Sequence, residues 1–166
     1  MIENAGALLV KFLPARPVPD ATHHDALVTL LRRYNEIGIT SITERNSSVA
    51  GYRTFEKLKT DGRLTVRVTV TIWLTTDGTV EDTEKSIRAL PFKTGDGDDS
   101  VKIGPLKVGV DGGALYGTAY MREPYGPAAF SLYGFSDPSY RGALRIAPEK
   151  MKNIVRTVHR LGWQMS

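Results

Sequence analysis

The most regular alternation of apolar and polar side chains lies between residues 64 and 75. Every second position there is Leu, Val or Ile, and most of the positions between them are threonine. A period of two over a β-branched run is typical of a strand with one buried face. Apolar runs at 39–43 and 101–110 predict two further strands, and residues 163–165 predict the beginning of a fourth.

Helical periodicity separates these strands. Apolar side chains at spacings of three and four predict helices over residues 22–37, 52–61, 80–90 and 148–161. Three of these helices end at a glycine that is followed within two residues by a predicted strand: Gly38, Gly62 and Gly162. Short connections of this kind bring the chain back so that the next strand lies parallel to the last. The sequence therefore predicts an α/β protein built from parallel βα units.

The predicted strands are too few for a closed parallel barrel, which needs eight strands and usually about 250 residues. We expect residues 1–166 to form a single domain that is part of a (β/α)8 TIM barrel. Strand edges and one sheet face would then remain unburied. Two arrangements could bury them: the chain belongs to a longer polypeptide, or it assembles with copies of itself as a homo-oligomer.

Composition narrows the possible chemistry. The chain has no cysteine, which excludes disulfides, zinc–thiolate sites and thiol catalysis. Its net charge is +4, but the basic residues are scattered among acids, which favours a solvated mixed surface over a nucleic-acid interface. No stretch approaches the ~20 apolar residues of a membrane helix, and residues 1–10 do not resemble a signal peptide. We expect a cytoplasmic protein that binds neither nucleic acid nor membranes.

One charged residue of the third predicted strand is a candidate for chemistry. Lys107 and Asp111 share one face of that strand, and the other face carries Leu106, Val108 and Val110. In a barrel the apolar face would meet the helices and Lys107 would point inward. A lysine there is costly unless it is neutralised, paired or used in a reaction. The alternative is a lysine of an edge strand in water.

Several sequence strings occur in an order that a known family uses. They lie at 34–43 (YNEIGITSIT), 64–68 (LTVRV), 104–113 (GPLKVGVDGG), 117–125 (GTAYMREPY) and 141–163 (RGAL to GW). The ordered set resembles the amidohydrolase superfamily, specifically its amidohydrolase-3 branch, over essentially the whole chain.

The resemblance implies a metal-dependent hydrolase on a distorted (β/α)8 barrel that cleaves amide or related C–N bonds of small molecules. The lysine of the family's Lys-x-x-x-Asp-Gly motif is expected to be carbamylated and to bridge divalent metals, with zinc as the expected metal. Lys107 matches that lysine. The metals would generate hydroxide at neutral pH and polarise the carbonyl under attack. Asp111 is expected to orient the lysine strand or the Gly112-Gly113 turn.

Four further residues are candidates for substrate binding. Glu44 and Asn46 follow the end of a predicted strand, where this family would place groups that contact the substrate; a solvated loop is the alternative. Tyr116 and Tyr120 lie in residues 111–146, a stretch without sustained periodicity that holds five of the seven tyrosines. A loop of this length is usually functional or disordered, so we expect a lid or a substrate wall in the complete enzyme.

The metal-binding histidines of the family have no counterparts in this sequence. The three histidines are His23 and His24, adjacent at a predicted helix start, and His159 on the last predicted helix. The family's His-x-His pair would lie before Met1, and its next histidine would follow Ser166. We therefore expect neither bound metal nor activity for this chain alone. A non-catalytic, self-associating α/β chain is the alternative.

Overall fold

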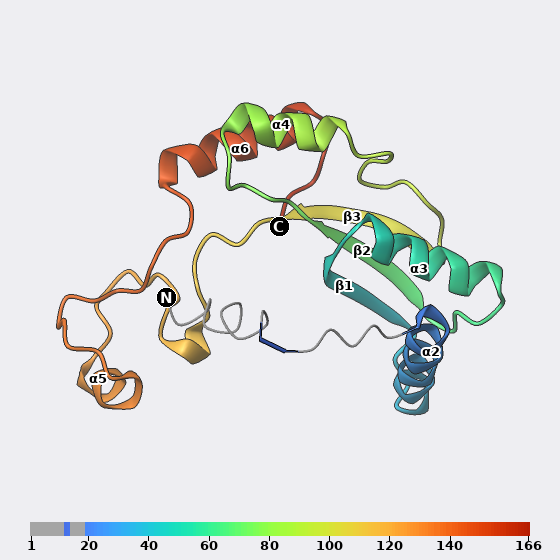
Figure 1. The fold of residues 1–166 in the computed structure, drawn as a ribbon, viewed down its shortest axis with the longest axis horizontal. Coiled ribbons are helices and arrows are strands. Elements are labelled where there is room, and N and C mark those ends of the chain that lie inside the picture. Colours follow the sequence, from blue (N-terminus) through green and yellow to red (C-terminus); the bar gives the residue numbers. More distant parts are fainter. Residues whose placement is uncertain (1–11, 14–18) are drawn as a thin grey trace. The chain divides into compact units, whose positions relative to one another are not determined.

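The computed structural model describes residues 12–13 and 19–166 of the 166-residue chain. The described residues divide into two compact units, one made of residues 19–108 with 152–166 and the other of residues 12–13 with 109–151. The first unit holds a three-stranded sheet and most of the helices (Figure 1). No helix in the described part of the chain is both long and apolar enough to cross a membrane.

The first unit alternates helices and strands as the sequence predicts. Its elements are α2 (Asp20–Glu36), β1 (Ser41–Ser47), α3 (Val49–Thr60), β2 (Arg67–Trp73), α4 (Val80–Arg88), β3 (Val101–Lys107) and α6 (Pro148–Arg160), whose first residues belong to the second unit. The strands pair in the order β1-β2-β3, and both pairings are parallel. The predicted α/β class with parallel βα units is therefore confirmed.

A short segment extends the sheet beyond β3. Met165 forms a parallel bridge with Leu106. The Leu106 N–H donates to the Gln164 carbonyl at 2.9 Å, and the Ser166 N–H donates to the Leu106 carbonyl at 2.9 Å. The predicted beginning of a fourth strand is thus paired with β3, in the parallel sense that βα units produce.

One face of the sheet is apolar and carries the core. Val68, Val70 and Ile72 of β2 are at most 3% exposed, and helix α3 contacts all three strands. Helices α4 and α6 lie side by side (Figure 1), joined by an ion pair of 2.5 Å between Glu84 and Arg160. The alternation in the sequence of β2 therefore separates a helix-covered face from an accessible face.

Two strands end at positions other than those predicted. β1 extends to Ser47, so Glu44 and Asn46 lie inside the strand and not after it. Since β1 is an edge strand with several exposed polar residues, its length is set by pairing with β2 and not by an apolar pattern. β3 ends at Lys107 instead of residue 110, and the glycine-rich segment that follows belongs to the second unit.

A bulge in β3 changes which side chains face the helices. Over two residues of β2, β3 advances by three, from Ile103 to Leu106. The extra residue lies at Gly104-Pro105, a sequence suited to an irregular strand. Because a shift of one residue exchanges the two faces of a strand, both Ile103 and Leu106 face the helices. The bulge therefore places Lys107 on the accessible face.

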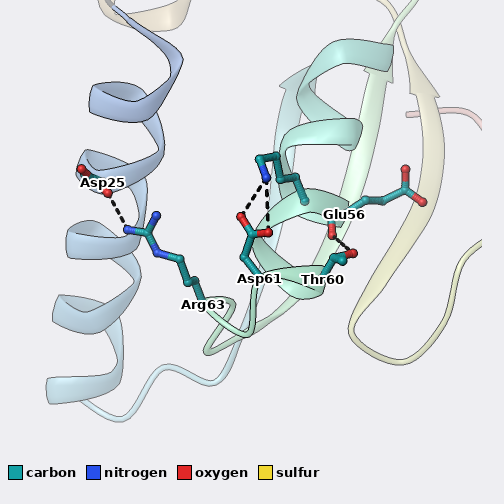
Figure 2. A network of polar contacts seen from close by, with 6 residues as sticks. Asp25, Glu56, Thr60, Asp61 and Arg63 are labelled. Carbon is teal, nitrogen blue, oxygen red and sulfur yellow. Dashed lines mark hydrogen bonds and ion pairs between the residues drawn. The ribbon is translucent and has the colours of Figure 1, made fainter.

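A polar contact connects α2 to the loop that follows α3 at the surface of the first unit, and a second lies at the end of α3 (Figure 2). Arg63, which follows α3, donates to the Asp25 carboxylate of α2 at 2.6 Å. At the end of α3, Lys57 pairs with Asp61 at 3.0 Å. Exposed pairs of this kind contribute roughly 0–1 kcal/mol each. Apolar packing, rather than these pairs, therefore holds the helices to the sheet.

The loop that precedes β3 is organised by Asp98. Its carboxylate accepts the N–H groups of Ser100 at 2.8 Å and Val101 at 3.1 Å, and it pairs with the Lys59 ammonium of α3. The hydrogen bond from Lys59, followed by those from the two backbone amides, lowers the pKa of Asp98 to about 2.

We expect Asp98→Asn to lower the free energy of unfolding at neutral pH by an amount that disappears in acid. A carboxyl group whose pKa falls on folding stabilises the fold above its unfolded pKa and loses that contribution as the pH falls through the folded pKa. In urea unfolding at several pH values, the difference between wild type and variant should shrink between about pH 4 and about pH 2. A difference that persists undiminished at the lower end of this range would contradict the lowered pKa.

The second unit contains more regular structure than the single loop expected over residues 111–146. It holds the short 3-10 helix η2 (Ala114–Tyr116) and the helix α5 (Pro127–Tyr133). Proline at the first position of α5 has the backbone angle that a helix start requires, and Gly134 with φ 71° ends the helix in the left-handed region. Nearby, the rings of Phe135 and Tyr140 pack with their centroids 4.3 Å apart.

Candidate active site

The three strands end at the same edge of the sheet. The last residues of β1, β2 and β3 are Ser47, Trp73 and Lys107. In parallel α/β sheets, ligands bind beyond the carboxyl ends of the strands. The accessible face that leads to this edge is polar, with side chains from all three strands: Ser41, Thr43, Arg67, Thr69 and Lys102.

Lys107 lies half-buried on the accessible face. It is paired in register with Trp73, and its ammonium nitrogen lies 6.0 Å from the centroid of the Trp73 ring. A cation at this distance from an aromatic face is attracted by the ring. Leu106, the preceding residue, is fully buried on the helix side. Lys107 therefore lies on the strand face opposite the buried Leu106.

Trp73 borders a hollow at the carboxyl ends of β1 and β2. The hollow has a volume of about 410 Å³ and is lined by Asn46, Ser47, Ser48 and Trp73. The Trp73 side chain is 41% exposed, unlike the buried apolar residues of the same strand. The sequence prediction missed Trp73. The signal was present, because Trp73 is an aromatic residue at a position where the alternation of residues 64–75 otherwise places mainly threonine.

A second bulge separates Glu44 from Asn46. Over two residues of β2, β1 advances by three, from Glu44 to Ser47. Glu44 is level with Val70, on the helix-covered face, and its carboxylate accepts the Asn46 N–H at 2.9 Å. Asn46 itself borders the hollow. Of these two predicted substrate-binding residues, Asn46 lies in the hollow beside Trp73. Glu44 instead stabilises the bulge through its hydrogen bond to the Asn46 N–H.

Thr71 of β2 lies between the two bulges and is fully buried. Within the described part of the chain, its hydroxyl oxygen has no hydrogen-bond partner. From mutational data, burial of an unpaired hydroxyl costs about 1–3 kcal/mol.

We therefore expect Thr71→Val to raise the free energy of unfolding by about 1 kcal/mol, because a methyl group replaces the hydroxyl without a change of shape. Thr83→Val is the matched control. Thr83 is 2% exposed, but its hydroxyl donates to the Thr79 carbonyl at 3.0 Å, so its replacement should destabilise. Urea unfolding measures both effects. Destabilisation by both variants would show that the Thr71 hydroxyl is paired in solution.

Asp111 belongs to the second unit and stabilises the Gly112-Gly113 turn. Its Oδ2 accepts the Tyr120 N–H at 2.8 Å. The Gly113 N–H donates to Thr118 Oγ1 at 3.0 Å. A Cβ atom on Gly112 would lie 2.1 Å from the same Thr118 oxygen, which is a severe clash. These contacts hold the Gly112-Gly113 turn against the segment that contains Tyr120.

The two candidate tyrosines are exposed in the second unit, Tyr116 by 60% and Tyr120 by 45%. The guanidinium carbon of Arg141 lies 5.4 Å from the centroid of the Tyr120 ring. The candidate residues thus fall into two groups. The first unit holds Lys107, Glu44 and Asn46, and the second holds Asp111, Tyr116 and Tyr120.

The described residues do not build a metal site by themselves. Across residues 12–13 and 19–166, no three His, Cys, Asp or Glu side chains are grouped so that they could hold a metal ion. His23 and His24 lie near the start of α2, and His159 lies in the last turn of α6.

The chain resembles known proteins along its length. The sequence model of the amidohydrolase family matches residues 1–166. An uncharacterized metal-dependent hydrolase from Pyrococcus horikoshii OT3 has a similar structure, with a TM-score of 0.64 and 18% identity over 99% of this chain and 30% of that chain. A second uncharacterized metal-dependent hydrolase, from Pyrococcus furiosus, has a TM-score of 0.65 and 14% sequence identity. The similarity covers 99% of this chain and 31% of that chain. No curated protein matches the chain.

These relationships differ in what they show. At 18% and 14% identity, the two solved structures establish a shared fold. The chain spans 30% and 31% of their lengths, so it corresponds to only a part of each. The sequence match is more specific, since it covers every residue from 1 to 166. The chain belongs to the amidohydrolase family.

Proposed function

We propose that this chain is one segment of a metal-dependent hydrolase that cleaves amide-type C–N bonds of small molecules. The observation that carries the proposal is the position of Lys107, which ends β3 on the accessible face of a parallel sheet. In a closed (β/α)8 barrel that face would line the interior, and the strand ends would surround the active site. The family match over residues 1–166 supports this placement.

Lys107 would act as a carbamate. Its neutral amine adds to carbon dioxide, an N–C bond forms, and one proton is released. The product has anionic oxygens that can bind divalent metals, of which zinc is the expected one. Because the described residues hold no group of three His, Cys, Asp or Glu side chains that could bind a metal, we expect the 166-residue chain alone to be inactive.

The test is detection of a carbamate on Lys107 in the longer polypeptide that contains this segment. Protein equilibrated with ¹³C-bicarbonate should show a carbamate carbon resonance, and elemental analysis should find a bound divalent metal. Lys107→Met should remove the resonance. Metal-loaded wild-type protein without a resonance that depends on Lys107 would contradict the proposal.

A non-catalytic, self-associating chain is the second candidate. The edge position of β1 favours it, because the outer backbone groups of an edge strand can pair with another chain. Light scattering of the 166-residue chain separates the two candidates. A dimer or larger assembly supports self-association, and a stable monomer contradicts it.

A further inference from the structure

We propose that the hollow at the carboxyl ends of β1 and β2 is a substrate subsite that takes an aromatic ring attached to the scissile amide. The inference rests on the proposed function and adds the class of substrate to it. The hollow is lined by Asn46, Ser47, Ser48 and Trp73. It is a shallow hollow of about 410 Å³ that is widely open to solvent.

Trp73 provides the main surface for a ring. Trp73 is 41% exposed, whereas Val70 and Ile72 earlier in the same strand are at most 3% exposed. An indole left in water forgoes the free energy that burial of a large aromatic surface provides. A ligand that covers Trp73 recovers that free energy, so the exposed ring is suited to binding.

The position of Trp73 connects the hollow to the proposed reaction. Trp73 is paired in register with Lys107, and the Lys107 nitrogen lies 6.0 Å from its ring centroid. A group stacked on the indole from the hollow would share the Trp73 ring with Lys107, which does not itself line the hollow. An amide attached to that group would be carried towards the same strand ends.

The other lining residues select for an uncharged substituent. Asn46, Ser47 and Ser48 are polar but neutral, so none of these three residues offers a counter-charge to an ionic group. Aromatic pairs gain energy from offset or edge-to-face contact beyond the area that they bury. A flat aromatic substituent should therefore bind better than a saturated ring of similar size.

Local hydrogen bonds form the rim of the hollow before any ligand arrives. The Asn46 N–H is held by the Glu44 carboxylate at 2.9 Å. Ser48 is the N-cap of α3, and its hydroxyl accepts the Gly51 N–H at 3.2 Å. Residues fixed in this way lose little conformational freedom when a ligand binds. The Asn46 backbone and the Ser48 side chain are therefore held in place before a ligand binds.

The experiment measures binding of two neutral amides to the 166-residue chain by ¹⁵N NMR. Acetanilide carries an aromatic ring, and N-cyclohexylacetamide carries a saturated ring on the same amide. Acetanilide should shift the resonances of the Asn46 side-chain amide, the Ser47 and Ser48 backbone amides and the Trp73 indole. The cyclohexyl compound should bind about five-fold more weakly.

Variants assign the effect to the indole ring. Trp73→Leu should weaken acetanilide binding by about tenfold, and Trp73→Phe should stay within about threefold of wild type because it keeps an aromatic face. Phe12→Leu removes another exposed aromatic side chain and should leave the affinity unchanged. Since Trp73 is partly exposed, the spectra should show that all three variants remain folded.

Three results would overturn the subsite. They are equal affinity for the two amides, unchanged affinity of Trp73→Leu, and no shifts at the lining residues up to the solubility limit of acetanilide. None of these measurements requires metal, carbamate or turnover. Failure of the subsite is therefore distinguishable from failure of the proposed hydrolase function, which the Lys107 carbamate resonance tests separately.

Discussion

Replacing Lys107 with methionine should abolish the amide hydrolysis proposed for the complete enzyme while this segment stays folded. Methionine keeps most of the apolar stem of the half-buried side chain, but it has no amine that could form a carbamate. Loss of groups that only orient metal ligands already costs about 10–100-fold in activity, so we expect kcat/KM to fall by at least about 100-fold. Steady-state kinetics and thermal unfolding measure the two parts of this prediction.

Lys102→Met is the matched control. Lys102 is an exposed lysine on the same face of β3, but it is level with Thr69 near the amino-terminal ends of the strands. It should retain the wild-type kcat/KM. Comparable losses in both variants, or a Lys107→Met enzyme that keeps more than about a tenth of its activity, would contradict the role of Lys107.

Replacing Leu106 with alanine should destabilise the chain by about 2–5 kcal/mol. The Leu106 side chain is fully buried between the sheet and the helices, and its backbone joins β3 to the segment at Met165. Truncation would leave a cavity that the surrounding strands can close only in part. The midpoint of urea unfolding, with the slope unchanged, measures the loss.

Leu115→Ala removes the same atoms from a side chain that is 86% exposed. Its effect should stay within about 0.5 kcal/mol, as is usual at exposed positions. Equal effects of the two leucine variants would mean that Leu106 is not part of the core, and the orientation of β3 would then be wrong.

The parts of the fold that follow local rules could be predicted from the sequence. The period of two in β2 predicts its buried face because one face is covered by helices and the other face is accessible. Gly38, Gly62 and Gly162 were predicted to end helices, and all three have positive φ angles, of 84°, 67° and 78°. Such angles are easily reached only by glycine, so its position in the sequence marks the helix end.

The parts that depend on distant partners could not be predicted. β1 continues through polar residues because β2 supplies its hydrogen bonds. The sequence of residues 41–47 contains no pattern that predicts this pairing. The bulge of β3 is also set by pairing, yet the apolar face with Leu106 and Val108 could be predicted because both residues follow the bulge. The hollow beside Trp73 combines residues of two strands that are adjacent only in the folded sheet.

If the polar face of the sheet lines the interior of a barrel, the lysines on that face should react differently in the short chain and in the longer polypeptide. Acylation by an amine-reactive ester, mapped by mass spectrometry, measures this directly. In the 166-residue chain Lys102, Lys107 and the exposed Lys85 of α4 should all react. In the longer polypeptide Lys102 and Lys107 should be protected while Lys85 still reacts. Unchanged reactivity of Lys102 and Lys107 would contradict an interior position for this face.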